Sequence, residues 1–122
     1  MAKILLAEDD KFLSNIFCSK LQKEGYEVVQ AYDGEEAIEK LKAENFDLIL
    51  IDLIMPKKDG FEVLAEMQIQ GLGKGVKIVV LSNLSQEEDV KKTKEMGVLD
   101  YWVKSNLTPQ ELVVKVKGIM SQ

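Results

Sequence analysis

Five short apolar runs alternate with segments of helical periodicity, and this alternation is the strongest constraint on the fold. The runs are rich in branched residues, as strands are, and they cover residues 3–7, 26–31, 47–51, 76–81 and 100–103. Parallel neighbours need crossover connections, so repeated strand–helix units predict a parallel sheet with helices on both faces. We therefore predict an α/β fold of flavodoxin-like type, a doubly wound five-stranded parallel sheet with strand order 2-1-3-4-5 and five flanking helices.

Sequence patterns also predict where the helices begin, end and face the sheet. An acceptor residue followed three places later by Glu is typical of a helix start, and this spacing occurs at Asp33/Glu36, Asp59/Glu62, Ser85/Glu88 and Thr108/Glu111. Glycines that permit a left-handed stop follow three helical segments, at Gly25, Gly71 and Gly97. The expected buried face of the first helix is Phe12, Leu13, Ile16, Phe17 and Leu21, and that of the last is Leu112, Val113, Val116 and Met120.

Length and composition favour one domain spanning residues 1–122, in the cytoplasm. The N-terminus lacks the pattern of a secretion signal, and the apolar runs are too short to cross a bilayer. A net charge of −5 is the wrong sign for gripping nucleic acid by its phosphates, and no basic cluster suits a membrane surface. With one cysteine, Cys18, no internal disulfide can form, and its helical context favours a buried thiol. Histidine is absent, which leaves carboxylates, hydroxyls, lysines and oxygen-binding metals to carry any chemistry.

Polar residues follow four of the five predicted strands. They are Glu8, Asp9 and Asp10 after the first, Asp52 after the third, Ser82 after the fourth and Lys104 after the fifth. Because the first and third strands are predicted neighbours, at least three carboxylates converge in the crevice at their carboxyl ends, where their repulsion calls for a cation. Oxygen donors without His favour Mg²⁺, or Mn²⁺ in its place. Asp10 alone is better explained as the cap of the first helix.

Four segments together resemble the receiver domain of two-component response regulators, and the resemblance covers essentially the whole chain. In family order and spacing they are residues 4–10 (ILLAEDD), 52–60 (DLIMPKKDG), 79–82 (VVLS) and 100–104 (DYWVK). The resemblance implies the chemotaxis-receiver fold and a phosphorylation-activated switch, rather than an enzyme acting on a separate substrate.

Carried over residue by residue, the resemblance implies a role for each position of the site. Asp52 is the expected phosphoryl acceptor. Mg²⁺ is expected to be held by Glu8, Asp9, Asp52 and the backbone carbonyl of Ile54. Ser82 would hydrogen-bond a phosphoryl oxygen, and Lys104 would pair with the phosphoryl group or, before phosphorylation, with Asp52.

The resemblance also implies a switch and its partners. Tyr101 occupies the aromatic switch position with Ser82, so phosphorylation is expected to rearrange the surface of helix four, strand five and helix five. A sensor histidine kinase or phosphotransfer protein is the expected donor, and a downstream protein is the expected target of that surface. The domain is expected to be a monomer or a phosphorylation-dependent dimer. Trp102 fits either the recognition surface or the core.

Two positions depart from the family pattern. Proline usually follows the conserved lysine in a cis linkage, whereas Ser105 follows Lys104 here. A cis bond before a non-proline residue costs roughly 3–4 kcal/mol, so a trans linkage that aims Lys104 differently is the alternative. Asn83 replaces a small residue after Ser82, near the entrance to the expected phosphoryl site, where it should influence access of water together with Ile54.

Two other functions remain open at this point. A small Mg²⁺-dependent phosphohydrolase also uses an Asp nucleophile after a strand, but it ordinarily carries a second Asp two residues later, where this chain has Ile54. A receiver-shaped interaction module that is never phosphorylated would have no need for the full set of acidic residues, serine and lysine.

Overall fold

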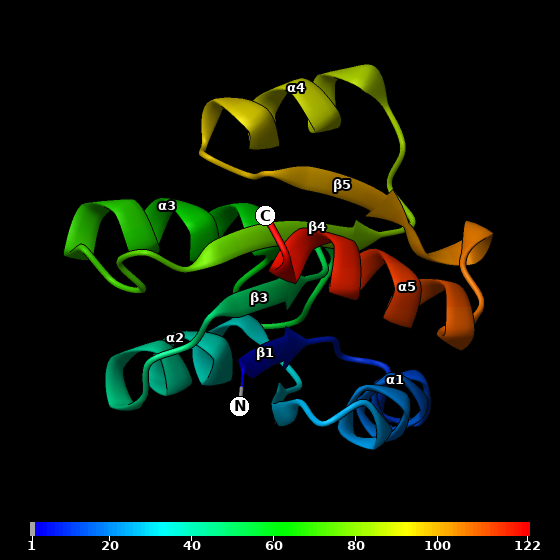
Figure 1. The fold of residues 1–122 in the computed structure, drawn as a ribbon. Helices are drawn as coiled ribbons and strands as arrows, with labels where there is room; N and C mark the ends of the chain where they lie inside the picture. Colours follow the sequence, from blue (N-terminus) through cyan, green and yellow to red (C-terminus); the bar gives the residue numbers. More distant parts are fainter. Residues whose placement is uncertain (1) are drawn as a thin grey trace.

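The sheet of this protein contains five parallel strands in the order β2-β1-β3-β4-β5, which confirms the predicted topology. The computed structural model describes residues 2–122. The elements follow in strict alternation (Figure 1): β1 Lys3–Ala7, α1 Lys11–Lys23, β2 Glu27–Ala31, α2 Gly34–Ala43, β3 Leu48–Ile51, α3 Gly60–Gln70, β4 Lys77–Ser82, α4 Glu87–Glu95, β5 Asp100–Val103, the short 3-10 helix η1 Lys104–Asn106 and α5 Pro109–Met120.

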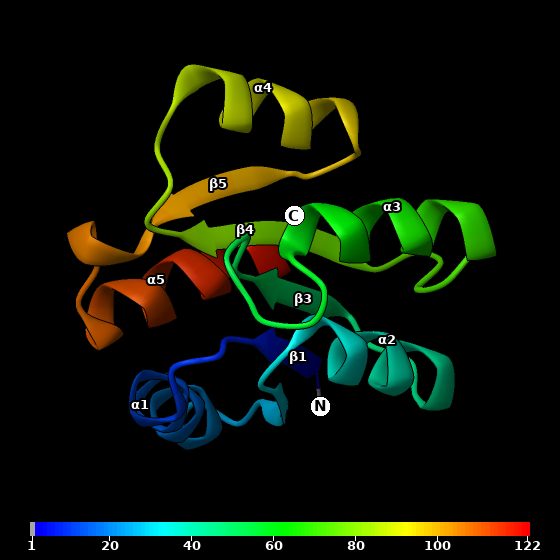
Figure 2. The same cartoon turned by 180° about the vertical axis from the view of Figure 1, so that it is seen from behind.

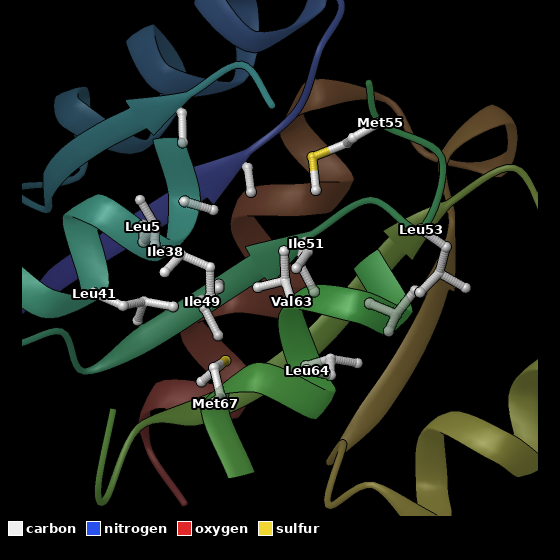
Figure 3. Close-up of a cluster of buried hydrophobic side chains, with 14 of the residues drawn as sticks. Leu5, Ile38, Leu41, Ile49, Ile51, Leu53, Met55, Val63, Leu64 and Met67 are labelled. Atoms are coloured by element: carbon white, nitrogen blue, oxygen red, sulfur yellow. The ribbon is translucent and has the colours of Figure 1, made fainter. Parts of the chain in front are cut away.

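Helices cover both faces of the sheet, which leaves its central strands out of contact with water. Figures 1 and 2 show α1 and α5 on one face and α2 and α3 on the other, with α4 lying along the β5 edge. On the α2/α3 face, Figure 3 shows Leu5, Ile49 and Ile51 of the sheet packed against side chains of the two helices. Every residue of β3 is fully buried, as a strand covered on both faces must be.

The register places the ends of β1 and β3 side by side. Ala7 pairs with Ile51, the last residue of each strand, and the Asp52 N–H donates to the Ala7 carbonyl oxygen at 3.0 Å. On the other side of β1, the Glu8 N–H donates to the carbonyl oxygen of Ala31 at 3.0 Å. Backbone pairing therefore continues one residue beyond the strands and fixes Glu8 and Asp52 as neighbours.

Most of the predicted helix starts are present, with one exception. The side chains of Asp10, Asp33, Asp59 and Thr108 each accept a hydrogen bond from the backbone N–H three residues later. The prediction for Ser85 is wrong, because α4 is preceded by Gln86 and has no side-chain cap. The β4–α4 loop is held instead at Leu84, whose N–H donates to Ser82 Oγ and whose carbonyl oxygen accepts from Tyr101.

The predicted buried face of α1 is partly wrong. Phe12 is 77% exposed, whereas Ser14 and Cys18 are buried beside Phe17 and Leu21. This face has the expected helical spacing but is rotated about the helix axis from the predicted one. Ser14 can be buried because its Oγ accepts a hydrogen bond from the Gln30 amide at 2.9 Å, which replaces a hydrogen bond to water. Within residues 2–122, no helix combines the length and apolar character that crossing a membrane requires.

Candidate functional site

Three carboxylates converge where β1 and β3 end. Glu8 and Asp9 follow β1, Asp52 follows β3, and one oxygen atom of each lies within 4.8 Å of the others. Glu8 and Asp52 are 1% and 3% exposed, whereas Asp9 is open to solvent. The set offers hard oxygen donors, one of them on an exposed residue, which fits Mg²⁺ or Mn²⁺ and suits neither zinc nor copper.

Lys104 supplies the positive charge that these buried carboxylates need. Its Nζ lies 2.6 Å from Asp52 Oδ2 and 2.7 Å from Glu8 Oε1. Burial lowers the pKa of Lys104, but its hydrogen bonds and charge attraction with Asp52 and Glu8 outweigh burial and raise it, so the ammonium persists. Burial raises the pKa of Glu8, and the Lys104 ammonium opposes that rise only in part. The Lys104 ammonium is thus the cation that lies between these two closely spaced carboxylates.

Backbone groups orient the two buried carboxylates. The Asp10 N–H donates to Glu8 Oε2 at 3.0 Å, and the Ile54 N–H donates to Asp52 Oδ1 at 3.1 Å. Charge-assisted bonds of this kind favour the ionised form and fix the side-chain rotamer. One oxygen of each carboxylate is thus held by backbone and the other faces Lys104.

The start of α3 approaches Asp52 too closely for any side chain. A Cβ added at Gly60 would lie 2.4 Å from the carbonyl oxygen of Asp52 and 2.7 Å from the Cα of Leu53. The Gly60 N–H donates to the Leu53 carbonyl oxygen at 2.9 Å, so the loop that begins at Asp52 is closed back onto its own start. Glycine is required here for close packing, since both neighbours are backbone atoms.

Ser82 and Tyr101 are joined to one another through Leu84. Ser82 is fully buried at the end of β4, and its Oγ accepts from the Leu84 N–H at 3.3 Å. Tyr101 Oη donates to the Leu84 carbonyl oxygen at 2.6 Å. Burial, with the nearby negative charges of Asp89 and Asp52, raises the pKa of Tyr101 to about 12. The hydrogen bonds thus gather Glu8, Asp52 and Lys104 into one group and Ser82 with Tyr101 into a second.

The peptide bond between Lys104 and Ser105 is trans, as are all peptide bonds within residues 2–122. The trans alternative is thus the one present, and with it the Lys104 ammonium reaches both carboxylates. Ser105 lies in the 3-10 turn η1, and its N–H donates to Asn83 Oδ1 at 2.8 Å. The sequence pattern places Asn83 near the site entrance but does not predict this bond, which joins the two positions, Asn83 and Ser105, that depart from the family pattern.

Trp102 belongs to the core. It is 4% exposed in the cluster between the sheet and α1/α5, and its Nε1 donates to Asp100 Oδ2 at 2.9 Å. Cys18 lies in the same cluster, as expected for a structural thiol, and burial raises its pKa.

The comparisons with known proteins agree with this geometry. Residues 4–117 match the family described as "Response regulator receiver domain". The chain belongs to that family. Two curated relatives of this receiver domain are the Bacillus subtilis proteins "Alkaline phosphatase synthesis transcriptional regulatory protein PhoP", at 36% identity, and "Transcriptional regulatory protein ResD", at 35%. Each alignment covers 118 residues, 97% of this chain and 48% of the relative, so the chain spans about half the length of the curated relatives it matches.

Solved receiver structures have the same fold. The Vibrio cholerae chemotaxis protein CheY4 is 31% identical, with a TM-score of 0.88 over 98% of each chain. The BeF3-activated N-terminal receiver domain of Klebsiella pneumoniae RstA is 29% identical, with a TM-score of 0.85 over 98% of this chain and 99% of the other. For a receiver domain of a two-component system, the acidic cluster of Glu8, Asp9 and Asp52 is consistent with a phosphoacceptor site that can bind a metal ion.

Proposed function

We propose that residues 1–122 form a single receiver domain in which Asp52 accepts a phosphoryl group from a sensor histidine kinase or a phosphotransfer protein. The observation that carries this proposal is the ammonium of Lys104 between Asp52 and Glu8, at 2.6 and 2.7 Å. A buried carboxylate that is held by a backbone N–H and paired with a lysine is positioned to act as a nucleophile, and the lysine can stabilise the negative charge of the phosphoryl group that it accepts. Such a site is consistent with self-catalysed phosphoryl acceptance and self-dephosphorylation only.

The donor set supports Mg²⁺ as the cofactor, or Mn²⁺ in its place. We assign its binding to Glu8, Asp9 and Asp52, whose oxygen atoms already cluster within 4.8 Å, and to the backbone carbonyl of Ile54. The bound ion would neutralise charge on the oxygens of the incoming phosphoryl group.

The chain's own residues perform the transfer. One oxygen of Asp52 attacks phosphorus while the bond from phosphorus to the donor's nitrogen or oxygen breaks, and the electron pair of that bond leaves with the donor. Lys104 follows the developing charge by passing from the carboxylate to a phosphoryl oxygen, and the Ser82 hydroxyl donates to another. The product is an acyl phosphate on Asp52.

The switch follows from the second hydrogen-bonded group. When the Ser82 hydroxyl donates to the phosphoryl group, Oγ is drawn toward that group, and the loop that it holds through the Leu84 N–H and that also holds Tyr101 shifts with it. The surface of α4, β5 and α5 then changes, and a downstream protein target would recognise it. A coupling of about 1–3 kcal/mol is enough for such control. The domain would act in the cytoplasm as a monomer or a phosphorylation-dependent dimer, without itself binding nucleic acid or a membrane.

Phosphorylation by a small donor tests the proposal. Incubation with Mg²⁺ and acetyl phosphate is expected to add the mass of one phosphoryl group, and Asp52→Asn is expected to abolish the gain. Asp47→Asn, directly before β3, is the control and should still gain the mass of one phosphoryl group. No gain in mass in the wild-type protein with Mg²⁺ would contradict the proposal.

The same experiment separates the two alternatives. Repeated turnover of phosphomonoesters would indicate a phosphohydrolase, for which Ile54 in place of a second Asp is unfavourable. Mg²⁺ binding without any phosphorylation would indicate a receiver-shaped interaction module.

A further inference from the structure

We propose that Asn83 is a positioning residue for Lys104, which it controls through the backbone N–H of Ser105. This inference rests on the proposed phosphoryl transfer to Asp52 and adds a residue to it. The observation that carries it is the hydrogen bond from the Ser105 N–H to Asn83 Oδ1, 2.8 Å long and 22 residues apart in sequence.

The Ser105 N–H finds its acceptor outside its own turn, in a bond between two exposed residues. In η1 the Leu107 N–H donates to the Lys104 carbonyl oxygen at 3.1 Å, which closes the turn. The first N–H groups of such a turn have no acceptor within it, and η1 has no side-chain cap of its own. Asn83 therefore acts as a cap supplied by a neighbouring strand end.

Sheet register explains why Asn83 is the residue in reach. Ser82 pairs with Val103, the last residues of β4 and β5. Asn83 and Lys104 come next on each strand, where the backbone ladder has ended. The Asn83 side chain extends the link between the two strands by one step, and that step lies directly beyond the lysine.

The position of the link gives it a role in the reaction. Lys104 is anchored through Val103 on one side and through Ser105 on the other, and its ammonium must reach Asp52 and Glu8. Asn83 also follows Ser82 directly, so one side chain links the end of β4, which carries the hydroxyl, to the turn that carries the ammonium. Both groups are assigned to the phosphoryl oxygens, and catalysis by positioned charges depends on such alignment.

This role differs measurably from control of water access. A residue that only shields the acyl phosphate from water changes the rate of dephosphorylation. Small and large substitutions at such a residue change this rate in opposite directions. Loss of lysine positioning slows phosphorylation and self-dephosphorylation together, because Lys104 stabilises charge in both transition states. Asn83→Ala and Asn83→Leu bracket the size of asparagine, and both remove the acceptor.

The test combines kinetics with NMR on the full chain. Phosphorylation by acetyl phosphate with Mg²⁺, and self-dephosphorylation after the donor is removed, are both followed by intact mass. Each rate is expected to be slowed about tenfold in both Asn83→Ala and Asn83→Leu. In the unphosphorylated protein, the Ser105 amide and the Lys104 ammonium signals should lose protection from exchange in both variants. Asn83→Asp keeps an acceptor and should retain protection of the Ser105 amide.

Three results would overturn the inference. The first is wild-type kinetics in Asn83→Ala, and the second is dephosphorylation rates that change in opposite directions in Asn83→Ala and Asn83→Leu. The third is unchanged protection of the Ser105 amide in both variants. Failure of the proposed function looks different, because the wild-type protein itself would then take up no phosphoryl group. In that case the Lys104 ammonium and Ser105 amide signals still decide whether Asn83 positions the lysine.

Discussion

Lys104 is the residue on which the electrostatics of the site depend. Its ammonium is the cation that Glu8 and Asp52 share, and both carboxylates are almost completely buried. Removing one partner from a buried ion pair costs more than the pair itself contributes, because the remaining charge is left without water or a partner.

Lys104→Met is therefore expected to lower the free energy of unfolding at neutral pH by about 3–5 kcal/mol. The pKa of Glu8, already raised by burial, should rise further without the ammonium. A group whose folded pKa is raised favours the folded state fully below its unfolded pKa, and this stability is lost as pH rises through the folded pKa. Urea unfolding should thus show a steeper loss of stability in the variant than in the wild-type protein as pH rises above the ordinary pKa of a glutamate.

Mg²⁺ should restore much of the stability lost in Lys104→Met, because it supplies the missing positive charge. Lys74→Met, at an exposed position, is the control for removal of a lysine. Equal stability of the two variants at pH 7 would show that Lys104 is not the partner that the buried acids require.

Among the α-helices within residues 2–122, α4 is the least embedded in the fold. Only Thr93 of its nine residues is buried. Its attachments are polar or local: Tyr101 Oη holds the preceding loop at Leu84, and the Gln68 amide donates to the Met96 carbonyl oxygen at 3.1 Å. An element with few buried apolar contacts is suited to rearrangement, since little packing energy opposes it.

Tyr101→Phe is expected to weaken the attachment of the β4–α4 loop and to lower the free energy of unfolding by about 1 kcal/mol. The phenol has its pKa raised from 10.0 to about 12, so its bond to Leu84 should contribute fully below pH 10 and be lost as pH rises through about 12. Tyrosinate absorbance checks this directly: the titration of the wild-type protein minus that of the variant should reveal one phenol ionising near pH 12. A difference already complete at pH 10 would contradict it, and Tyr32→Phe is the control.

In the molecule as a whole, the parallel sheet gathers the proposed acidic, hydroxyl and lysine residues of the site at the carboxyl ends of its strands. The carboxyl ends of β1, β3, β4 and β5 lead to Glu8 and Asp9, Asp52, Ser82 and Lys104. Separations of 52 and 96 residues in sequence become contacts of 2.6 and 2.7 Å. A ligand that binds at these strand ends therefore contacts residues from distant parts of the sequence, and its binding stabilises the folded domain as a whole.

Mg²⁺ is accordingly expected to raise the thermal midpoint of the whole domain. Binding to the folded state alone stabilises it by RT ln(1 + [Mg²⁺]/Kd), about 2.7 kcal/mol at a hundred times Kd. Asp9→Asn should lose this response with little change in intrinsic stability, because Asp9 is exposed. Glu39→Gln, on the outer face of α2, is the control, and KCl at matched ionic strength should not substitute for Mg²⁺. A response that persists in Asp9→Asn would show that the ion binds elsewhere.

The amino-acid sequence was enough to predict the order and type of the elements and the polar residues at the strand ends. These features are local, because apolar periodicity, capping residues and polar residues at strand ends, such as Asp52, can be recognised from a few neighbouring positions in the sequence. The strand order followed from chain connectivity, since a strand–helix alternation leaves few arrangements of a doubly covered sheet.

Only the tertiary structure decided which side chains meet. It turned Phe12 to solvent and buried Ser14, because Gln30 from another element satisfies the serine hydroxyl. It placed the start of α4 one residue later than Ser85 predicts, and it joined Asn83 to Ser105 across two strand ends. Each outcome depends on the direction of a side chain and on a partner distant in sequence, and neither is encoded in a local pattern of residues.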